Sequence, residues 1–259
     1  MGHVSFAIQS IKLKPLVGIS GCLTGQKVRY DGEAKLLPFY DSLSDYLTWL
    51  SFCPEVDAGL GIPRPPVQLV EVKSATQALG VNDKSLNVTR ALVSSSQQFW
   101  QQNSLSNQTN KLHQAKKTKD LMCGYIFKSR SPSCGLGSTP LFDMEGNQKG
   151  STSGFFAKEA KNHCILAEES WLTSPDNQAI FITACHINHS LLSESSLNIE
   201  LYDLLFDLLI KDPEGLNTKA DADIFTLEIM LSKLTNTYNE KTALNRRLFY
   251  PKLTSFWNL

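Results

Sequence analysis

The sequence lacks the features that mark membrane-spanning and secreted proteins. No apolar run in its 259 residues is long enough to cross a bilayer. The first fifteen residues contain a short apolar patch, but no hydrophobic segment followed by a small-residue cleavage site. Lys plus Arg and Asp plus Glu are both 25, so the net charge of zero gives no argument for nucleic acid or membrane binding. We therefore expect a cytoplasmic protein with no membrane partner.

The six cysteines also lack a close pair. Structural zinc sites usually draw ligands from pairs such as C-x-x-C, and this sequence has none. A disulfide framework is typical of small secreted chains, whereas this chain is long enough to bury a core, so reduced thiols are expected. Thiolates from separate loops suit zinc, copper(I) or an iron–sulfur cluster, and the spacing alone leaves these choices open.

Hydrophobic patterning predicts strands that alternate with helices over the first two thirds of the chain. Strands are predicted for the short apolar segments 15–20, 67–72, 121–127 and 164–167. Helices are predicted for the segments 38–50, 87–114 and 155–162. This alternation predicts an α/β fold, a parallel Rossmann-like sheet with helices on both faces.

The last third of the chain has a different pattern. Leucines at helical spacing near 201–208 and apolar residues at the same spacing over 220–234 predict two amphipathic helices. We therefore expect two domains, an α/β domain over 15–175 and a small helical C-terminal extension over 190–259.

Three cysteines lie where strands are predicted to end. Cys22 and Cys134 closely follow two predicted strands, and Cys53 comes before an irregular Gly/Pro-rich stretch at 58–66. Ligands of parallel sheets bind beyond the carboxyl ends of the strands, so we expect these three thiols to meet in one crevice.

Three long segments, in the same order, resemble the motifs of one family. They are GISGCLTGQKVRYDG at 18–32, CPEVDAGLGIPRPP at 53–66 and KSRSPSCG at 128–135, with a weaker match at 87–89. The family is that of the thiouracil desulfidases (TudS), and the resemblance covers roughly residues 15–170. The part of the chain that follows is not recognisable as a member of any family.

The resemblance implies a 4Fe-4S cluster bound by Cys22, Cys53 and Cys134, with a fourth iron that has no protein ligand. Such an iron takes a soft thiocarbonyl sulfur and polarises its bond to carbon. Water then adds to the carbon and sulfide leaves, with no net electron transfer. The implied enzyme, a lyase or hydrolase, cleaves the C–S bond of thiouracil or of a thiouridine nucleotide.

Further site residues follow from the resemblance. Glu55, two positions after a predicted ligand, is expected to handle the proton of the water. Ser131 is expected to contact the substrate or relay a proton, although Ser133 is an alternative and both hydroxyls suit a turn. A basic rim suited to a phosphate is expected, with predicted substrate-binding roles for Ser133 and the cations Arg29, Arg64 and Lys128, beside Lys27 and Arg130.

Other functions stay open. Thiolated tRNA is an alternative substrate, because relatives with a second helical domain resemble tRNA-acting enzymes and segments 167–172 and 179–183 resemble the linker to that domain. Glu33-Ala34-Lys35 stands where the family often has Gly-His-Lys, which leaves the substrate open. A non-catalytic, metal-stabilised binding module is a second alternative. A cysteine-nucleophile hydrolase is disfavoured, because none of the five histidines lies in a matching motif.

Overall fold

The computed structural model describes residues 14–103, 122–160 and 163–192. Within these ranges no helix has the length and apolar character needed to cross a membrane. The predicted helices of the C-terminal extension lie outside the described residues, so the division into two domains stays a prediction.

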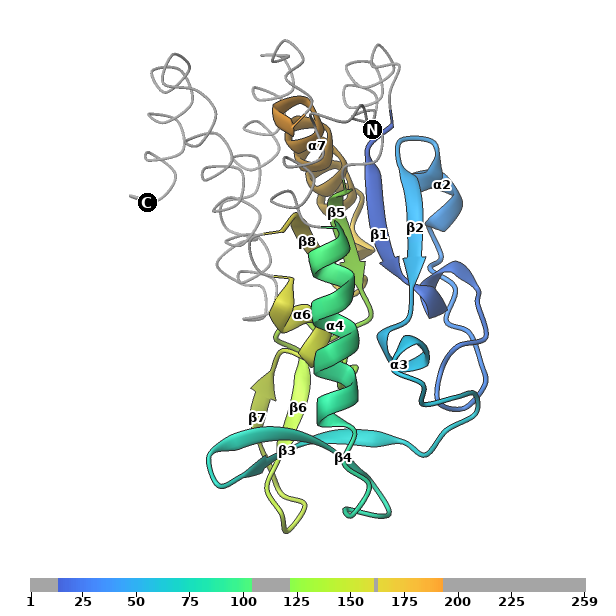
Figure 1. The fold of residues 1–259 in the computed structure, drawn as a ribbon. Helices are drawn as coiled ribbons and strands as arrows, with labels where there is room; N and C mark the ends of the chain where they lie inside the picture. The colour runs from blue at the N-terminus through green and yellow to red at the C-terminus, as the bar shows by residue number, and fades with distance from the viewer. Residues whose placement is uncertain (1–13, 104–121, 161–162, 193–259) are drawn as a thin grey trace.

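The centre of the fold is a four-stranded parallel sheet in the order β2-β1-β5-β8. Its strands are β1 (Leu16–Ser20), β2 (Thr48–Phe52), β5 (Met122–Phe127) and β8 (Ile165–Glu168). Every residue of β5 and β8 is buried, which is the pattern of strands covered on both faces. The predicted parallel α/β architecture is confirmed (Figure 1).

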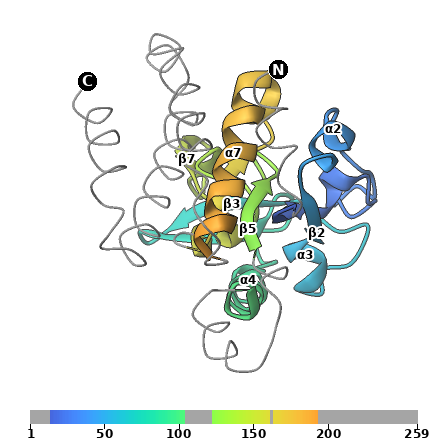
Figure 2. The same ribbon diagram turned by 90° about the horizontal axis from the view of Figure 1, so that it is seen from above.

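Helices cover both faces of this sheet. Helix α7 (Pro175–Leu192) lies on one face, while α4 (Thr89–Asn103) lies on the other (Figure 2). Helix α6 (Phe155–Glu159) packs with α4, because its Phe156 belongs to the same core cluster as Phe99 and Trp100. The α7 side is mainly aliphatic, whereas the other side holds a cluster of large aromatic rings: Phe99, Trp100, Tyr125, Phe127 and Phe156.

A glycine in β1, Gly18, leaves room for the ring of Tyr125. A Cβ atom on Gly18 would lie 2.2 Å from a ring carbon of Tyr125, so any side chain there would displace the tyrosine. With the glycine in place, the Tyr125 hydroxyl reaches the carbonyl oxygen of Phe52, at the end of β2. This contact joins β2 and β5, the two strands beside β1, near the ends at which the loops with the cysteines begin.

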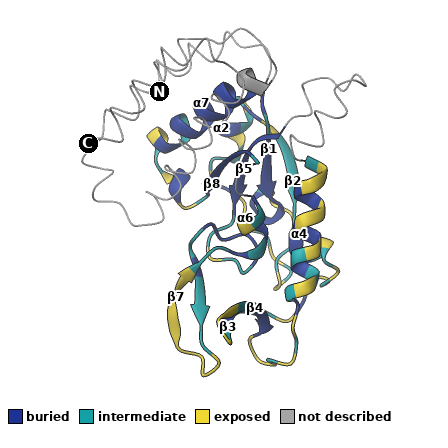
Figure 3. Ribbon diagram, turned by 60° about the vertical axis from the view of Figure 1, so that its left-hand side comes forward, coloured by how far each residue is buried: buried dark blue, intermediate teal, exposed yellow. Residues whose placement is uncertain are grey.

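A second sheet, in the order β4-β3-β6-β7, packs below the first. It consists of β3 (Val67–Val72), β4 (Ala75–Gly80), β6 (Thr139–Phe142) and β7 (Gln148–Thr152). The prediction of β3 is confirmed, whereas the other three strands were not predicted. Most of β7 is exposed (Figure 3), so its sequence lacks the apolar residues that would indicate a strand.

The predicted helix at 38–50 is wrong in its second half. The helix there is only α2 (Tyr40–Ser44), and residues from Thr48 onward form β2. Leu43 and Leu47 are buried, as their helical spacing predicted, but Leu50 pairs with Gly18 of β1. A parallel neighbour in the sheet thus outweighs local periodicity.

The other predicted helices begin where expected. Asn87 precedes α4, and its side-chain oxygen accepts a hydrogen bond from the Thr89 amide at 3.1 Å, at the start of the helix. Residues 104–121, which include the end of the predicted helix 87–114, lie outside the described part of the chain. Three further short helices are η1 (Gly21–Thr24), α3 (Pro54–Asp57) and η3 (Trp171–Thr173).

Candidate active site

The three predicted cluster cysteines follow three adjacent strands. Cys22 lies in η1, directly after β1, and Cys53 lies between β2 and α3. Cys134 lies in the loop after β5, on the other side of β1. All three line one cavity of about 350 Å³, so the expected convergence at the carboxyl edge of the sheet is confirmed.

The cysteine thiols are free and strongly desolvated. The pKa of Cys22 is raised to about 11, mainly by burial and next by the neighbouring Cys53. Burial also raises the pKa of Cys53, although backbone amides of Val56 and Glu55 donate to its sulfur and oppose the shift. Burial raises the pKa of Cys134 well above its usual value. The thiols are therefore protonated at neutral pH, and a bound metal must displace their protons.

The chemistry of these donors is that of an iron–sulfur site, because three cysteine thiols line one cavity. Among the described residues, no group of three His, Cys, Asp or Glu side chains is placed to hold one metal ion. A zinc ion needs all its thiolates about 2.3 Å from one centre. A cluster instead takes each thiolate on a different iron, so its ligands stand further apart. The three thiols come from separate loops and are soft donors of the kind that such a cluster takes.

Glu55 is held by two partners on opposite sides. It lies in the first turn of α3, and Arg64 donates to its Oε2 from Nε at 2.8 Å and from Nη2 at 2.7 Å. The Ser133 hydroxyl donates to its Oε1 at 2.9 Å. Nη1 of Arg64 donates in turn to the carbonyl oxygens of Val28 and Gly61, both at 3.0 Å. A carboxylate oxygen can accept two hydrogen bonds, and the part of the chain that the structure describes supplies Oε1 of Glu55 with the one from Ser133.

The two serines of the third motif have different partners. Ser131 Oγ accepts hydrogen bonds from the backbone amides of Ser133 at 3.2 Å and of Cys134 at 3.1 Å. Ser131 lines the cavity, and its hydroxyl hydrogen has no acceptor among the described residues. Ser133 is fully buried and its hydroxyl is committed to Glu55. A Cβ on Gly154 would lie 2.5 Å from the Ser133 backbone, so this glycine lets α6 pack against the loop.

Each cation predicted to bind substrate has a carboxylate partner. Arg29 pairs with Asp31 at 3.0 Å, and Lys128 pairs with Glu169 at 2.6 Å. Arg64 pairs with Glu55, as described above. All three line the cavity, as does Arg130, whereas Lys27 of the predicted rim does not.

Comparison with known proteins assigns the family. The family model described as 2-thiouracil desulfurase matches residues 17–170, which is more than half of the chain. The chain belongs to the 2-thiouracil desulfurase family. It is therefore an enzyme of the class that removes sulfur from thiouracil, as the resemblance of its motifs implied.

Solved structures offer a further similarity to this desulfurase. A structure described as the [4Fe-4S]-dependent thiouracil desulfidase TudS is 28% identical, with a TM-score of 0.43. The similarity covers 62% of this chain and 93% of that chain. No curated protein matches the chain.

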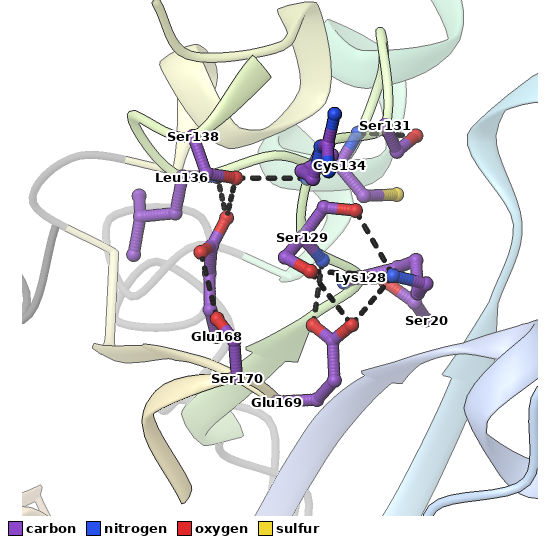
Figure 4. A network of polar contacts seen from close by, with 11 residues as sticks. Ser20, Lys128, Ser129, Ser131, Cys134, Leu136, Ser138, Glu168, Glu169 and Ser170 are labelled. Atoms are coloured by element: carbon purple, nitrogen blue, oxygen red, sulfur yellow. Dashed lines mark hydrogen bonds and ion pairs between the residues drawn. The ribbon is translucent and has the colours of Figure 1, made fainter. Parts of the chain in front are cut away.

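The desulfurase site contains residues that sequence reasoning missed. The Ser20 hydroxyl accepts a hydrogen bond from the Lys128 amide at 3.1 Å, and hydrogen bonding with the Ser20 side chain lowers the pKa of Cys134 in part. Glu168 and Glu169 contact the loop that carries Cys134 (Figure 4). Ser20 ends β1 and Glu168 ends β8, so both lie at the strand edge where the cysteines also lie. Ser20 and Glu168 each end an apolar strand segment, and that position is the feature of the sequence that could have indicated them.

Proposed function

We propose that this enzyme is a non-redox, iron–sulfur-dependent desulfidase that removes sulfur as sulfide from thiouracil or a thiouridine nucleotide. One observation carries the proposal: three free cysteines from three adjacent strand ends line a single cavity together with Glu55. The free thiols of Cys22, Cys53 and Cys134 also fit a reducing compartment, and we propose the cytoplasm as its location.

Cys22, Cys53 and Cys134 would hold a 4Fe-4S cluster. When bound, the cluster supplies an iron without a protein ligand, a Lewis acid suited to a soft thiocarbonyl sulfur. Hydrogen bonding with protein groups already lowers the pKa of two ligand thiols in part, with the Ser20 side chain acting on Cys134 and the Val56 and Glu55 backbone on Cys53. Such hydrogen bonds favour the thiolate form that a metal requires.

Glu55 acts as the general base in this proposal. Arg64 and Ser133 fix the carboxylate from both sides, and Glu55 lines the cavity. Oε1 accepts one hydrogen bond from the described residues, so we propose that it also accepts one from water. A water bound there donates one hydrogen to Glu55 and presents its oxygen to the ring carbon of the substrate. Glu55 takes the proton as the water attacks. Oxygen replaces sulfur at that carbon, and no electrons are transferred in the overall reaction.

Ser131 and Ser133 have different roles in this proposal. Ser131 lines the cavity with an uncommitted hydroxyl hydrogen, so we propose that it donates to the substrate. Ser133 stays a predicted substrate-binding residue, but the contact that its hydroxyl makes is with Glu55, which favours a role in orienting that base.

A small substrate suits the cavity better than tRNA does. About 350 Å³ is at the small end of the volumes of small-molecule sites. Arg29, Arg64 and Lys128 are each paired with a carboxylate, which leaves little positive charge to bind a long phosphate backbone.

Sulfide release tests the proposal. The chain, reconstituted anaerobically with iron and sulfide, is assayed with thiouracil, thiouridine monophosphate and bulk thiolated tRNA. We expect turnover of the base or the nucleotide. Glu55→Gln should lower kcat by about 10²–10⁴ without changing the iron content, because it keeps the shape and loses the base. Glu71→Gln is the matched control, because Glu71 is also paired with a cation, Lys149, but lies outside the cavity. Turnover of tRNA alone would overturn the substrate assignment, and full activity of Glu55→Gln would overturn the mechanism.

A further inference from the structure

We propose that Glu168 and Glu169 are positioning residues that clamp the two ends of the loop bearing Cys134. The loop, residues 128–138, also carries Ser131 and Ser133. The inference depends on the proposed function in one respect, because it takes Cys134 to be a cluster ligand. Neither carboxylate lines the cavity, so both act through the loop and not on the substrate.

Glu169 holds the start of the loop. Its Oε2 accepts a hydrogen bond from the Ser129 amide at 2.6 Å, and its Oε1 accepts one from the Ser129 hydroxyl at 2.8 Å. The Lys128 ammonium donates to the same Oε1 at 2.6 Å (Figure 4). The Glu169 amide donates to the Phe127 carbonyl oxygen at 3.0 Å, which fixes Glu169 beside the end of β5. The first two loop residues are therefore held through backbone and side chain together.

Glu168 holds the end of the loop. It is only 2% exposed, and its Oε1 accepts hydrogen bonds from the Leu136 amide at 2.6 Å and from the Ser138 hydroxyl. The Ser138 oxygen accepts in turn from the Arg130 amide at 2.8 Å, so Glu168 reaches back across the loop. Oε2 of Glu168 accepts from Ser170 at 3.2 Å. Several charge-assisted bonds at a buried carboxylate make a strong anchor.

The two carboxylates reach different ends of the loop although they are consecutive. Glu168 is the last residue of β8, and Glu169 follows it in the turn beside the end of β5. One side chain reaches Leu136 and Ser138, and the next reaches Lys128 and Ser129 (Figure 4). Between these anchors the loop is closed by the Gly135 amide, which donates to the Ser131 carbonyl oxygen at 2.9 Å. Cys134 is thereby fixed relative to the strands that carry Cys22 and Cys53.

The test measures the accessibility of Cys134 directly. The full chain is treated with iodoacetamide before and after reconstitution with iron and sulfide, and alkylation of each cysteine is followed by mass spectrometry. Cys22 and Cys53 serve as internal references in every sample. The variants are Glu168→Ala, Glu169→Ala and the conservative Glu168→Gln. Glu71→Ala is a control that removes an ion-paired carboxylate of β3, away from the loop.

We expect Cys134 to react at least about tenfold faster relative to Cys22 in both alanine variants, since losing one charge-assisted hydrogen bond shifts local opening by that factor. Glu168→Gln should restore slow alkylation, because an amide oxygen can accept from Leu136 and Ser138. The reconstituted alanine variants should lose iron to a chelator faster than the parent, with an altered cluster spectrum. Glu71→Ala should behave as the parent in every measurement.

Two outcomes would overturn the inference: equal acceleration at all three cysteines, or unchanged Cys134 reactivity in both alanine variants. If an alanine variant fails to fold, Glu169→Gln is used in its place. That substitution keeps the shape of the side chain but loses one hydrogen-bond acceptor and the ion pair with Lys128. Slow Cys134 alkylation in that variant would also overturn the inference. A parent chain that binds no iron would defeat the proposed function alone, because alkylation without iron still measures the clamp.

Discussion

Replacing Arg64 with methionine should destabilise the fold more than any surface substitution. The Arg64 side chain is 4% exposed and that of its partner Glu55 is 12% exposed, so the pair is almost completely desolvated. Arg64→Met keeps much of the apolar volume but leaves the Glu55 carboxylate buried with only the Ser133 hydroxyl as a partner. It also removes a donor from the carbonyl oxygens of Val28 and Gly61.

The expected cost follows from this geometry. Breaking one side of a buried ion pair costs about 3–5 kcal/mol, because the remaining charge is uncompensated. For a domain of this size that loss lowers the melting temperature by about 6–20 °C. Arg64→Lys should cost less, since it keeps the charge, but a lysine cannot reproduce two parallel bonds to one carboxylate oxygen.

A double-mutant cycle separates this explanation from simple loss of packing. The free energy of unfolding is measured in urea for Arg64→Met, Glu55→Gln and the double variant. Glu55→Gln removes the orphaned charge, so the double variant should be more stable than the sum of the single losses predicts, by about 2 kcal/mol or more. Strict additivity, or a loss below about 1 kcal/mol for Arg64→Met, would refute the reasoning.

Three further predictions concern other parts of the structure. Burial lowers the pKa of His186 to about 4, from 6.5 in the unfolded chain, so the unfolded state binds more protons between these values. Stability should therefore fall by about 3 kcal/mol as the pH drops from 6.5 to 4, and urea titrations of His186→Gln should show a smaller loss. Trp100→Phe removes the bond from Nε1 to the Phe156 carbonyl oxygen and should cost about 1–3 kcal/mol in thermal unfolding, whereas no loss would contradict the assigned contact. Burial raises the pKa of Cys22 to about 11, so iron binding must release protons. The apparent iron affinity, measured by competition with a chelator, should therefore rise with pH between about 6 and 9. An affinity that does not change with pH would contradict this prediction.

The sequence predicted the strands whose apolar runs end directly at a loop. β1 and β5 are buried on both faces, so each reads as an uninterrupted apolar segment, and the convergence of Cys22 and Cys134 followed from that. β2 was not predicted, because Leu43, Leu47 and Leu50 have helical spacing although only the first lies in a helix. Pairing with β1 decides the structure there, and pairing between distant segments has no local signature.

The sequence indicated which charged residues belong to the site but not their partners. Arg64 was predicted as a rim cation, whereas it is buried and holds Glu55, across an irregular loop that no periodicity describes. Lys128 pairs with Glu169, which is 41 residues away in the sequence and is brought close by the pairing of β5 with β8. Such contacts depend on the tertiary fold, so a motif can name the residues without giving their roles.

Iron and sulfide content per chain tests the central claim most directly. The protein is purified anaerobically, with alanine variants of Cys22, Cys53 and Cys134, and matched alanine variants of the other three buried cysteines, Cys123, Cys164 and Cys185. We predict about four irons and four sulfides per chain, as expected for a [4Fe-4S] cluster, lost in each of the first three variants and retained in the other three. One zinc per chain without iron, or iron binding that survives loss of Cys22, Cys53 or Cys134, would contradict the account.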